Sequence, residues 1–538
     1  MSARNGLVAA ALGVVLVLGG VAVRAEPPAP ATAASTQPIV DARPRLAAVG
    51  FEADKEGDPR DAWLASAFEE VLTWRLRRVP ALVAIPTIRL YQAQQELQDP
   101  NAPPPPWPTV VRGLGAGYLL SGHCNGPSDA VMLQLTLTRL DDPNAGAERV
   151  IIPAGRVVEV LDQATRWVLA RLNVSDLDEA VAKRVYGPPT RSLSALEYFA
   201  VATVAAHANR TRDALHYANE AVDSDRRFRS ALGLLAQLEL HLGSEGRNRA
   251  AGRLRIISDL ARMDGDPLDR ANAELALSLV AQSDGASEAA RTRAETALNL
   301  ATESRDIYGQ AATLAWLADV YLTWQPEASA KPTEDERQRQ ERARLQQAAE
   351  YQRTLLNMLE ALNDQIAALP VASKLALILE RLGESDAALA MHQKTLEMAK
   401  ALGSRRHEAT AWLYLGQWYR NQKRWPDALD AMTQCLELAD EVAKPAVHIA
   451  LGALYQAMPA PEKALAEFEL AYQETRKSDD LPNQFTCLRE MARVRRQLGQ
   501  RKEAVTALQE ALDIAQVLEL PEKDALRAEL ESWKEDKP

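Results

Sequence analysis

The chain has 538 residues, of which 47% are hydrophobic, 25% are charged and only 5% are aromatic, and its formal net charge is -11. This acidic balance argues against a nucleic-acid-binding protein, because phosphate groups require a basic surface. The second half of the chain is rich in Ala, Leu, Glu, Arg and Gln, which favours helices over a large β-sandwich. The composition therefore predicts a largely helical, soluble chain.

Residues 1–25 have the pattern of a secretory signal peptide. Arg4 precedes an apolar run from Leu7 to Val23, and Val23-Arg24-Ala25 places small residues before a cleavage site. The run is also near the lower length limit of a membrane span, so an uncleaved inner-membrane anchor remains the alternative. Residues 26–43 are rich in Pro and Ala and predict a flexible tether. We therefore expect a bacterial protein that is periplasmic or otherwise exported, with membrane contact only if the signal stays uncleaved.

Residues 44–175 predict a small α/β domain. The clearest signal is the alternation at 131–138, which should place Leu133, Leu135 and Leu137 on one face of a strand. The stretch at 99–108 contains too many prolines for regular structure and predicts an inserted loop. From apolar runs and helical spacing we expect strands at 45–51, 82–85, 118–122, 131–138 and 148–152, and helices at 62–78, 87–98, 109–114 and 158–172.

Several segments of this region match a known domain in the same order. They are Leu46–Phe51, Asp58-Pro59 followed by Trp63-Leu64-Ala65, Val79–Val83, Gly115–Gly122 and the strand Leu133–Leu137. The order resembles the N-terminal domain of the periplasmic translocation protein TolB and of the FlgO and CsgG families. The resemblance implies a domain that assists assembly and contacts and brings no catalytic residues. The Pro-rich insertion departs from the family pattern and would alter the surface beside it.

From residue 192 onwards the sequence repeats as pairs of helices. One unit has, at positions 4, 7, 8, 11, 20, 24 and 27 of a tetratricopeptide repeat, the residues Trp412, Leu415, Gly416, Tyr419, Ala428, Met432 and Cys435. The next unit has Leu451, Gly452, Tyr455, Ala464, Phe468 and Ala471 in the same register. Small residues in this pattern let two helices approach closely, while large ones fill the space beside them. Residues 192–520 therefore predict a right-handed tetratricopeptide-type solenoid of about seven or eight helix pairs. A polar insertion is expected near 325–345, and a capping helix and tail at 521–538.

A solenoid of this kind leaves a long concave surface open, which suits protein binding better than catalysis. On the helix face expected to line that surface lie Gln417 and Arg420, with Asn421 alongside, and in the last clear unit Arg489, Arg493 and Arg496. Arginine binds carboxylates through two parallel hydrogen bonds, so these six residues are the candidate peptide-binding site. The alternative is a solvated, charged face that keeps the end of the array soluble.

Other residue patterns give no catalytic, cofactor or metal site. Gly113, Gly115 and Gly117 precede a strand, whereas a dinucleotide-binding loop follows one, so they predict a tight turn. His123 and Cys124 lack a second pair of ligands at metal-binding spacing and are expected to be ordinary strand residues. We therefore expect no enzyme, with a hydrolase that uses an unrecognised acidic site as the minor alternative.

The cysteines are few and far apart along the chain. Cys124, Cys435 and Cys487 are expected to be small buried residues, and a Cys435–Cys487 disulfide is the alternative. The fold does not require oxidation.

Together these patterns support two hypotheses about function. The first is an exported scaffold or adaptor that binds one or more envelope proteins or peptides on the concave face of the solenoid. The second is an accessory subunit of an envelope secretion or surface-assembly machine, which would act through oligomerisation of the N-terminal domain.

Overall fold

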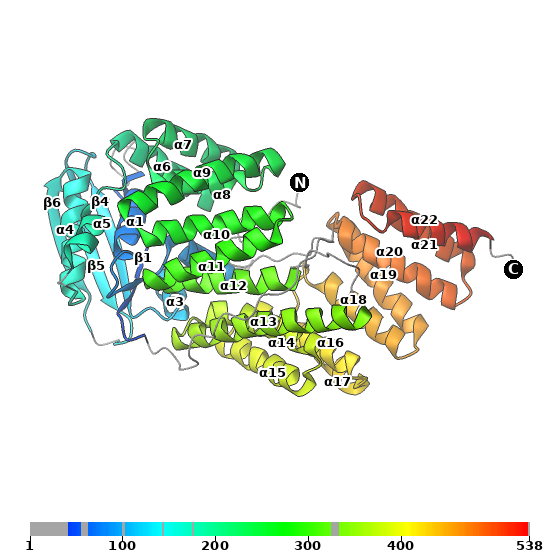
Figure 1. Ribbon diagram of the computed structural model, residues 1–538. Helices are drawn as coiled ribbons and strands as arrows, with labels where there is room; N and C mark the ends of the chain where they lie inside the picture. The colour runs from blue at the N-terminus through cyan, green and yellow to red at the C-terminus, as the bar shows by residue number, and fades with distance from the viewer. Residues whose placement is uncertain are drawn as a thin grey trace. The chain divides into compact units, whose positions relative to one another are not determined.

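The computed structural model describes residues 41–54, 63–98, 103–142, 145–174, 177–323 and 333–535 (Figure 1). These residues form two compact units, and the division between them falls at Val371 and Ala372, inside one helix. The predicted signal peptide and residues 26–40 of the tether lie outside the described residues. The same holds for residues 99–102 of the Pro-rich insertion and 325–332 of the polar insertion.

The N-terminal unit begins with a mixed sheet, which in the described residues has six strands in the order β3-β1-β4-β5-β6, with β2 paired to β4. β1 runs parallel to β3 and β4, whereas β4, β5 and β6 are antiparallel neighbours. β5 and β6 are consecutive in the chain and therefore form an antiparallel hairpin. The strands are β1 (Arg45–Ala48), β2 (Glu52–Ala53), β3 (Val83–Ala84), β4 (Tyr118–Asn125), β5 (Val131–Arg139) and β6 (Glu148–Gly155).

One face of the sheet packs against α1 (Trp63–Leu76) and α4 (Val157–Arg171). Leu133, Leu135 and Leu137 of β5 are buried there, as the alternation predicts. Phe68 of α1 is fully buried in the same core. α2 (Thr87–Glu96) contacts β1, and α3 (Trp107–Gly113) packs on α2. This core is continuous with that of the following helices, because the same cluster of buried residues extends to Leu277 of the solenoid.

After α5 (Glu179–Tyr186), the described residues form eight consecutive helix pairs followed by a single last helix. The fold class predicted from the sequence, a small α/β domain followed by an all-helical solenoid, is confirmed. The pairs are α6 (Leu193–His207) with α7 (Thr211–Ser224), α8 (Arg229–Glu239) with α9 (Gly243–Asp264), α10 (Pro267–Ser283) with α11 (Ser287–Glu303), α12 (Ile307–Thr323) with α13 (Glu334–Ala361), α14 (Gln365–Leu382) with α15 (Ser385–Leu402), α16 (Arg405–Asn421) with α17 (Trp425–Leu438), α18 (Lys444–Ala457) with α19 (Pro461–Lys477), and α20 (Leu481–Gln497) with α21 (Arg501–Val517); α22 (Lys523–Glu535) is the last helix.

Within the N-terminal unit, arginines of the α/β domain bind aspartates at the turns between helix pairs. Each of these aspartates directly precedes the first helix of a pair: α10, α12 or α14. All three carboxylates are almost completely buried. The ion pairs are Arg78 Nη2 to Asp266 Oδ2 at 2.9 Å, Arg77 Nη2 to Asp306 Oδ2 at 2.9 Å, and Arg89 Nη2 to Asp364 Oδ1 at 3.2 Å.

The same three turns also receive hydrogen bonds on their backbone carbonyls. Arg184 Nη1 donates to Gly265 O at 3.1 Å, and Arg43 Nη1 donates to Arg305 O at 3.1 Å. Arg45 Nη1 donates to Leu362 O at the third turn. These carbonyls lie at helix ends, where no intrahelical donor is available. We call the six arginines at positions 43, 45, 77, 78, 89 and 184, with the three turns, the arginine seam.

In the C-terminal unit, the small residues of the repeat lie where the paired helices come closest. A Cβ added to Gly452 of α18 would stand 2.6 Å from Phe468 Cε1 of α19. A Cβ added to Gly416 of α16 would stand 2.8 Å from Met432 Cγ of α17. This close approach is the steric reason for glycine at these positions.

Two general properties of the described residues complete the fold. The helices there include none that is both long enough and apolar enough to cross a membrane. Cys124, Cys435 and Cys487 are buried, free thiols, as expected, so the alternative Cys435–Cys487 disulfide is not formed.

Candidate functional site

The six predicted peptide-binding residues lie on α16 and α20, each of which is the first helix of its repeat. We call the side of α16 and α20 that carries these six residues, together with the same side of α18, the first-helix face. Gln417, Arg420 and Asn421 are at the end of α16, and the three arginines are on α20. α18 lies between these helices and packs against both. The six predicted residues therefore form two groups on one series of helices rather than one cluster.

The arginines of α20 already contact other side chains of the chain. Arg489 Nε and Arg493 Nη1 both donate to Glu490 Oε1, at 3.1 Å and 3.0 Å. The guanidinium carbon of Arg496 lies 4.6 Å from the ring centroid of Trp533 on α22. Arg493 has about half of its side chain exposed, at 47%, and is the most accessible of the pair that shares Glu490. An incoming carboxylate would therefore compete with Glu490 for Arg489 and Arg493.

The group on α16 is tied to the preceding repeat. Arg420 Nη2 donates to Asn421 Oδ1 at 3.3 Å, and Asn421 Nδ2 donates to Glu380 Oε2 at 3.4 Å. The other carboxylate oxygen of Glu380 lies 2.7 Å from Nε2 of the buried His392. Gln417 is half-buried on the same side of α16. The end of α16 is thus a polar network in which one acidic side chain already has two partners.

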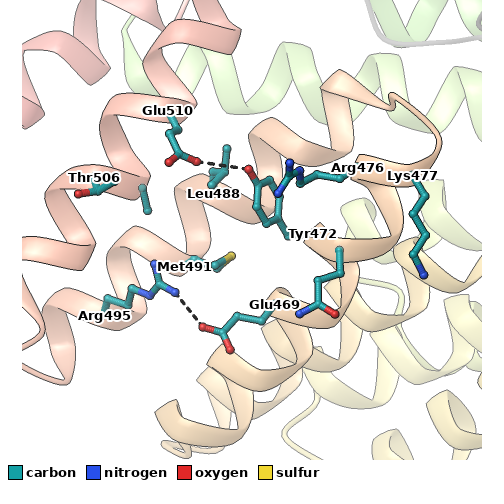
Figure 2. Close-up of a pocket in the computed structure, with 11 residues that line it drawn as sticks. Glu469, Tyr472, Arg476, Lys477, Leu488, Met491, Arg495, Thr506 and Glu510 are labelled. Atoms are coloured by element: carbon teal, nitrogen blue, oxygen red, sulfur yellow. Dashed lines mark hydrogen bonds and ion pairs between the residues drawn. The ribbon is translucent and has the colours of Figure 1, made fainter.

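A second feature of the C-terminal unit was not predicted from the sequence. Two successive second helices, α19 and α21, form the walls of a groove of about 740 Å³ whose floor is α20 (Figure 2). We call it the second-helix groove. Leu488 and Met491 of α20 and Ala507 of α21 form its apolar base and are buried.

Two polar links hold the walls of the second-helix groove, and both are drawn as dashed lines in Figure 2. Arg495 Nη2 of α20 donates to Glu469 Oε1 of α19 at 2.8 Å. The hydroxyl of Tyr472 on α19 donates to Glu510 Oε2 on α21 at 3.3 Å. Burial raises the pKa of Tyr472, with a further contribution from the Glu510 carboxylate, so the phenol keeps the proton that it donates. The links join all three helices around the groove.

Two cations at the end of α19 complete the groove. Arg476 and Lys477 are both exposed. Arg476 lies 5.9 Å from the ring centroid of Tyr472. Within the part of the chain that the structure describes, neither residue has an acidic side chain at ion-pairing distance.

The second-helix groove and the predicted arginines occupy different sides of α20. With 3.6 residues per turn, the groove residues Leu488, Met491 and Arg495 are centred roughly 130° around the helix from Arg489, Arg493 and Arg496. Sequence reasoning missed the groove because three helices build it and no short motif marks it. The adjacent basic pair at the end of a helix was the one local signal.

Gly113, Gly115 and Gly117 lie directly before β4. Gly115 has φ of +69°, and a Cβ there would collide with Leu362 O at the arginine seam. His123 and Cys124 lie in β4, and the described residues contain no group of three or more His, Cys, Asp or Glu side chains arranged to hold a metal ion. Gly115 and Gly117 therefore lie in the turn that their position before a strand predicts, whereas Gly113 is the last residue of α3.

The tetratricopeptide repeat family model matches residues 365–441 and 445–516 of the chain. These residues span α14 to α21, which include the first-helix face and the second-helix groove. The match confirms the repeats predicted from the spacing of small and large residues. A search of curated proteins finds no match.

The solved structures that match the chain have low sequence identity to it. A signal transduction ATPase with a tetratricopeptide repeat sensor from Pyrococcus horikoshii is 17% identical, with a TM-score of 0.40, and the match covers 66% of this chain and 52% of that one. The protein BtubC from P. vanneervenii is 20% identical, with a TM-score of 0.36 and coverage of 44% and 92%. A tetratricopeptide repeat protein from Parabacteroides merdae is 11% identical, with a TM-score of 0.34 and coverage of 52% and 93%. This chain thus spans about half the length of the ATPase.

Proposed function

We propose that this chain is an exported, non-catalytic scaffold or adaptor that binds a partner protein on the first-helix face of its C-terminal unit. Tetratricopeptide repeats form open arrays of helices that are suited to binding proteins or peptides. The observation that carries the proposal is that this face has an apolar stretch between two groups of polar side chains. The half-buried, apolar Ile449 and Ala453 of α18 lie between the polar end of α16 and the arginines of α20.

This arrangement has the features of a peptide-binding surface. An apolar stretch provides the contact area that excludes water, and polar groups at its ends fix the position and direction of a bound segment. A partner with an acidic residue near one end would meet Arg493, which is the exposed member of the pair that shares Glu490. The partner would be an envelope protein or peptide, as expected for an exported chain.

Affinity purification from the native envelope, followed by mass spectrometry, tests this assignment. The chain carrying Arg489→Ala, Arg493→Ala and Arg496→Ala should lose a stoichiometric partner that the unchanged chain retains. A control with Arg337→Ala, Arg339→Ala and Arg342→Ala removes the same charge from exposed positions on α13. Partners retained equally by all three forms would refute a role for the α20 arginines.

Export itself rests on the sequence pattern of residues 1–25, and it has a direct test. Cell fractionation and the intact mass of the purified chain should place the protein outside the cytoplasm, with cleavage after Ala25. A mass that includes residues 1–25, in the membrane fraction, would instead support the uncleaved anchor.

A second candidate function is that of an accessory subunit of an envelope secretion or surface-assembly machine, acting through self-association of the α/β domain. The observation in its favour is β6, an edge strand whose Ile151 is 63% exposed. β6 also contains Pro153, and proline in an edge strand is one of the features that protect a sheet from pairing with another chain. Light scattering of the full chain should show an oligomer that Ile151→Lys dissociates; a monomer would exclude this function.

A further inference from the structure

We infer that the second-helix groove is a separate binding site and that its ligand is an acidic peptide segment carrying an apolar side chain. The inference goes beyond the proposed function, because the groove uses residues on a different side of α20 from the first-helix face. Three features of the groove indicate this ligand: its apolar base, the two cations at the end of α19, and the order of both along the groove.

The base of the groove selects an apolar side chain. Leu488 and Met491 of α20 and the ring of Tyr472 on α19 line it (Figure 2), and Ala507 of α21 is a further lining residue. Methionine adapts its shape to varied apolar partners and makes favourable contacts with aromatic rings. The volume of about 740 Å³ lies within the range of sites that bury small ligands or a few peptide side chains.

The charges of the groove select a carboxylate at one end. Glu469 is paired with Arg495, and Glu510 accepts the hydrogen bond of Tyr472. Arg476 and Lys477 remain, next to each other in the last turn of α19. A guanidinium binds a carboxylate through two parallel hydrogen bonds, and an ammonium adds a point charge beside it.

The positions of the acidic residues also set the direction of the ligand. Glu510 accepts from the neutral phenol of Tyr472 and keeps its charge, which would repel further negative charge in the middle of the groove. The acidic residues of the peptide therefore belong at the Arg476 and Lys477 end. The apolar side chain then lies over Leu488 and Met491. The expected ligand therefore has an apolar residue followed closely by two or more carboxylates, and a uniformly acidic peptide would bind less well.

A purely structural role for the two cations makes a different prediction. Basic residues in the last turn of a helix interact favourably with its dipole, so Arg476 and Lys477 could act only on the stability of α19. In that case their replacement would lower thermal stability and leave peptide binding unchanged. Measuring melting temperature and binding on the same variants separates the two roles.

The test is selection from a random dodecapeptide library displayed on phage, using the intact chain as bait. Arg476→Glu with Lys477→Glu is the groove variant. The matched control is Arg501→Glu with Lys502→Glu, which reverses an identical, exposed Arg-Lys pair at the start of α21, outside the groove. Selected peptides are then synthesised with a fluorescein label, and their affinities are measured by fluorescence anisotropy on all three proteins and on the α20 triple-alanine variant.

The expected result is a consensus with an apolar residue followed by acidic ones, whose affinity falls by about tenfold or more on the groove variant and less than about threefold on the control. The α20 triple-alanine variant should retain binding of these peptides. The proposed site on the first-helix face and the proposed site in the groove can therefore be refuted independently of each other. Either of two results overturns the inference: no acidic consensus is enriched, or the peptides bind the groove variant as well as they bind the unchanged chain.

Discussion

Replacing Asp266 with Asn should weaken the attachment of the α/β domain to the solenoid. The Asp266 carboxylate, 1% exposed, accepts hydrogen bonds from Arg78 at 2.9 Å and from Arg229 at 3.2 Å. It also caps α10 by accepting from the backbone N–H of Asp269 at 3.4 Å. The substitution keeps the size of the side chain and the capping oxygen but removes the negative charge between two arginines.

The size of the effect follows from what remains around the two arginines. Breaking a buried ion pair on one side typically costs about 3–5 kcal/mol of the free energy of unfolding. Here Asp269 still lies 2.6 Å from Arg78 and 2.9 Å from Arg229, so neither cation is left without a carboxylate. Asparagine is also as good an N-cap as aspartate. We therefore expect a loss of about 2–3 kcal/mol, at or below the lower end of that range.

Hydrogen exchange and urea unfolding together measure this loss. Peptides from the start of α10 and the end of α1 should exchange faster in the variant, because local opening of the arginine seam becomes easier. The matched control is Asp264→Asn, which removes the same charge from a carboxylate that also pairs with Arg229, at 3.1 Å, but is 53% exposed. The control should change the free energy of unfolding by less than about 0.5 kcal/mol. Equal effects of the two substitutions would show that burial of the Asp266 carboxylate adds nothing to its contribution.

The pH dependence provides an independent check on the same carboxylate. Although burial opposes its ionisation, the charges of Arg78 and Arg229 hold the pKa of Asp266 below its usual value of 3.8. A carboxyl whose pKa is lowered in the folded state contributes stability above its unfolded pKa, and that stability is lost as the pH falls. The unchanged chain should therefore lose this contribution as the pH falls below about 4, and the Asn variant should show a shallower acid limb.

Three further predictions concern other parts of the chain. Gly452→Ala should lower the free energy of unfolding by about 1–3 kcal/mol in urea titrations, because its methyl group would overlap Phe468. The control is Gly252→Ala inside α9, which should not lower it, because an added methyl group there meets nothing within 4 Å and the backbone is helical. Burial raises the pKa of Glu69 from 4.5 to about 7, so its contribution to stability is present below pH 4.5 and is lost as the pH rises to about 7. Glu69→Gln should make the free energy of unfolding in urea less dependent on pH over that range, whereas Glu303→Gln at an exposed position should not. Burial also raises the pKa of Cys435 to about 11 and of Cys487 to about 12, so neither thiol should react with a thiol reagent near pH 8 until denaturant is added, and rapid modification of the native chain would contradict the structure.

The α/β domain was predictable from the sequence because its signals are local. The alternation in β5 and the helical spacing in α1 each depend on residues within a few positions of one another, and both elements are found where they were expected. α5 was missed, although Asp178 caps it and Gly187 ends it. It has only 8 residues, which is too short for helical periodicity to stand out.

The arginine seam could not be predicted, because its partners are remote in sequence. Arg78 and Asp266 are 188 residues apart, and Arg89 and Asp364 are 275 residues apart. An aspartate before a helix reads as an ordinary N-cap, and nothing in the local sequence shows that a distant arginine also binds it. Charge patterns alone therefore cannot separate a solvated cap from a buried contact between domains.

The candidate site shows the same division between local and remote information. Repeat spacing placed Arg489, Arg493 and Arg496 on one stripe of α20, but Glu490 and Trp533, which contact them, were not part of that reasoning. The second-helix groove depends on how three helices pack and thus lay outside any single repeat. Spacing identifies which face a residue occupies, whereas the contacts that make a surface accessible come from the packed structure.

The turns of the C-terminal unit differ from those of the arginine seam in a way that bears on binding. Ser404 caps α16 and Asp480 caps α20 with their own side chains, and Arg405 donates to Glu437 O and Leu438 O at the end of α17. The backbone N–H and carbonyl groups at these turns therefore have hydrogen-bond partners within the same unit and need no arginine from the α/β domain. It follows that weakening the seam through Asp266 should leave peptide binding at the first-helix face and in the second-helix groove intact, because both surfaces lie on helices whose turns do not depend on that contact.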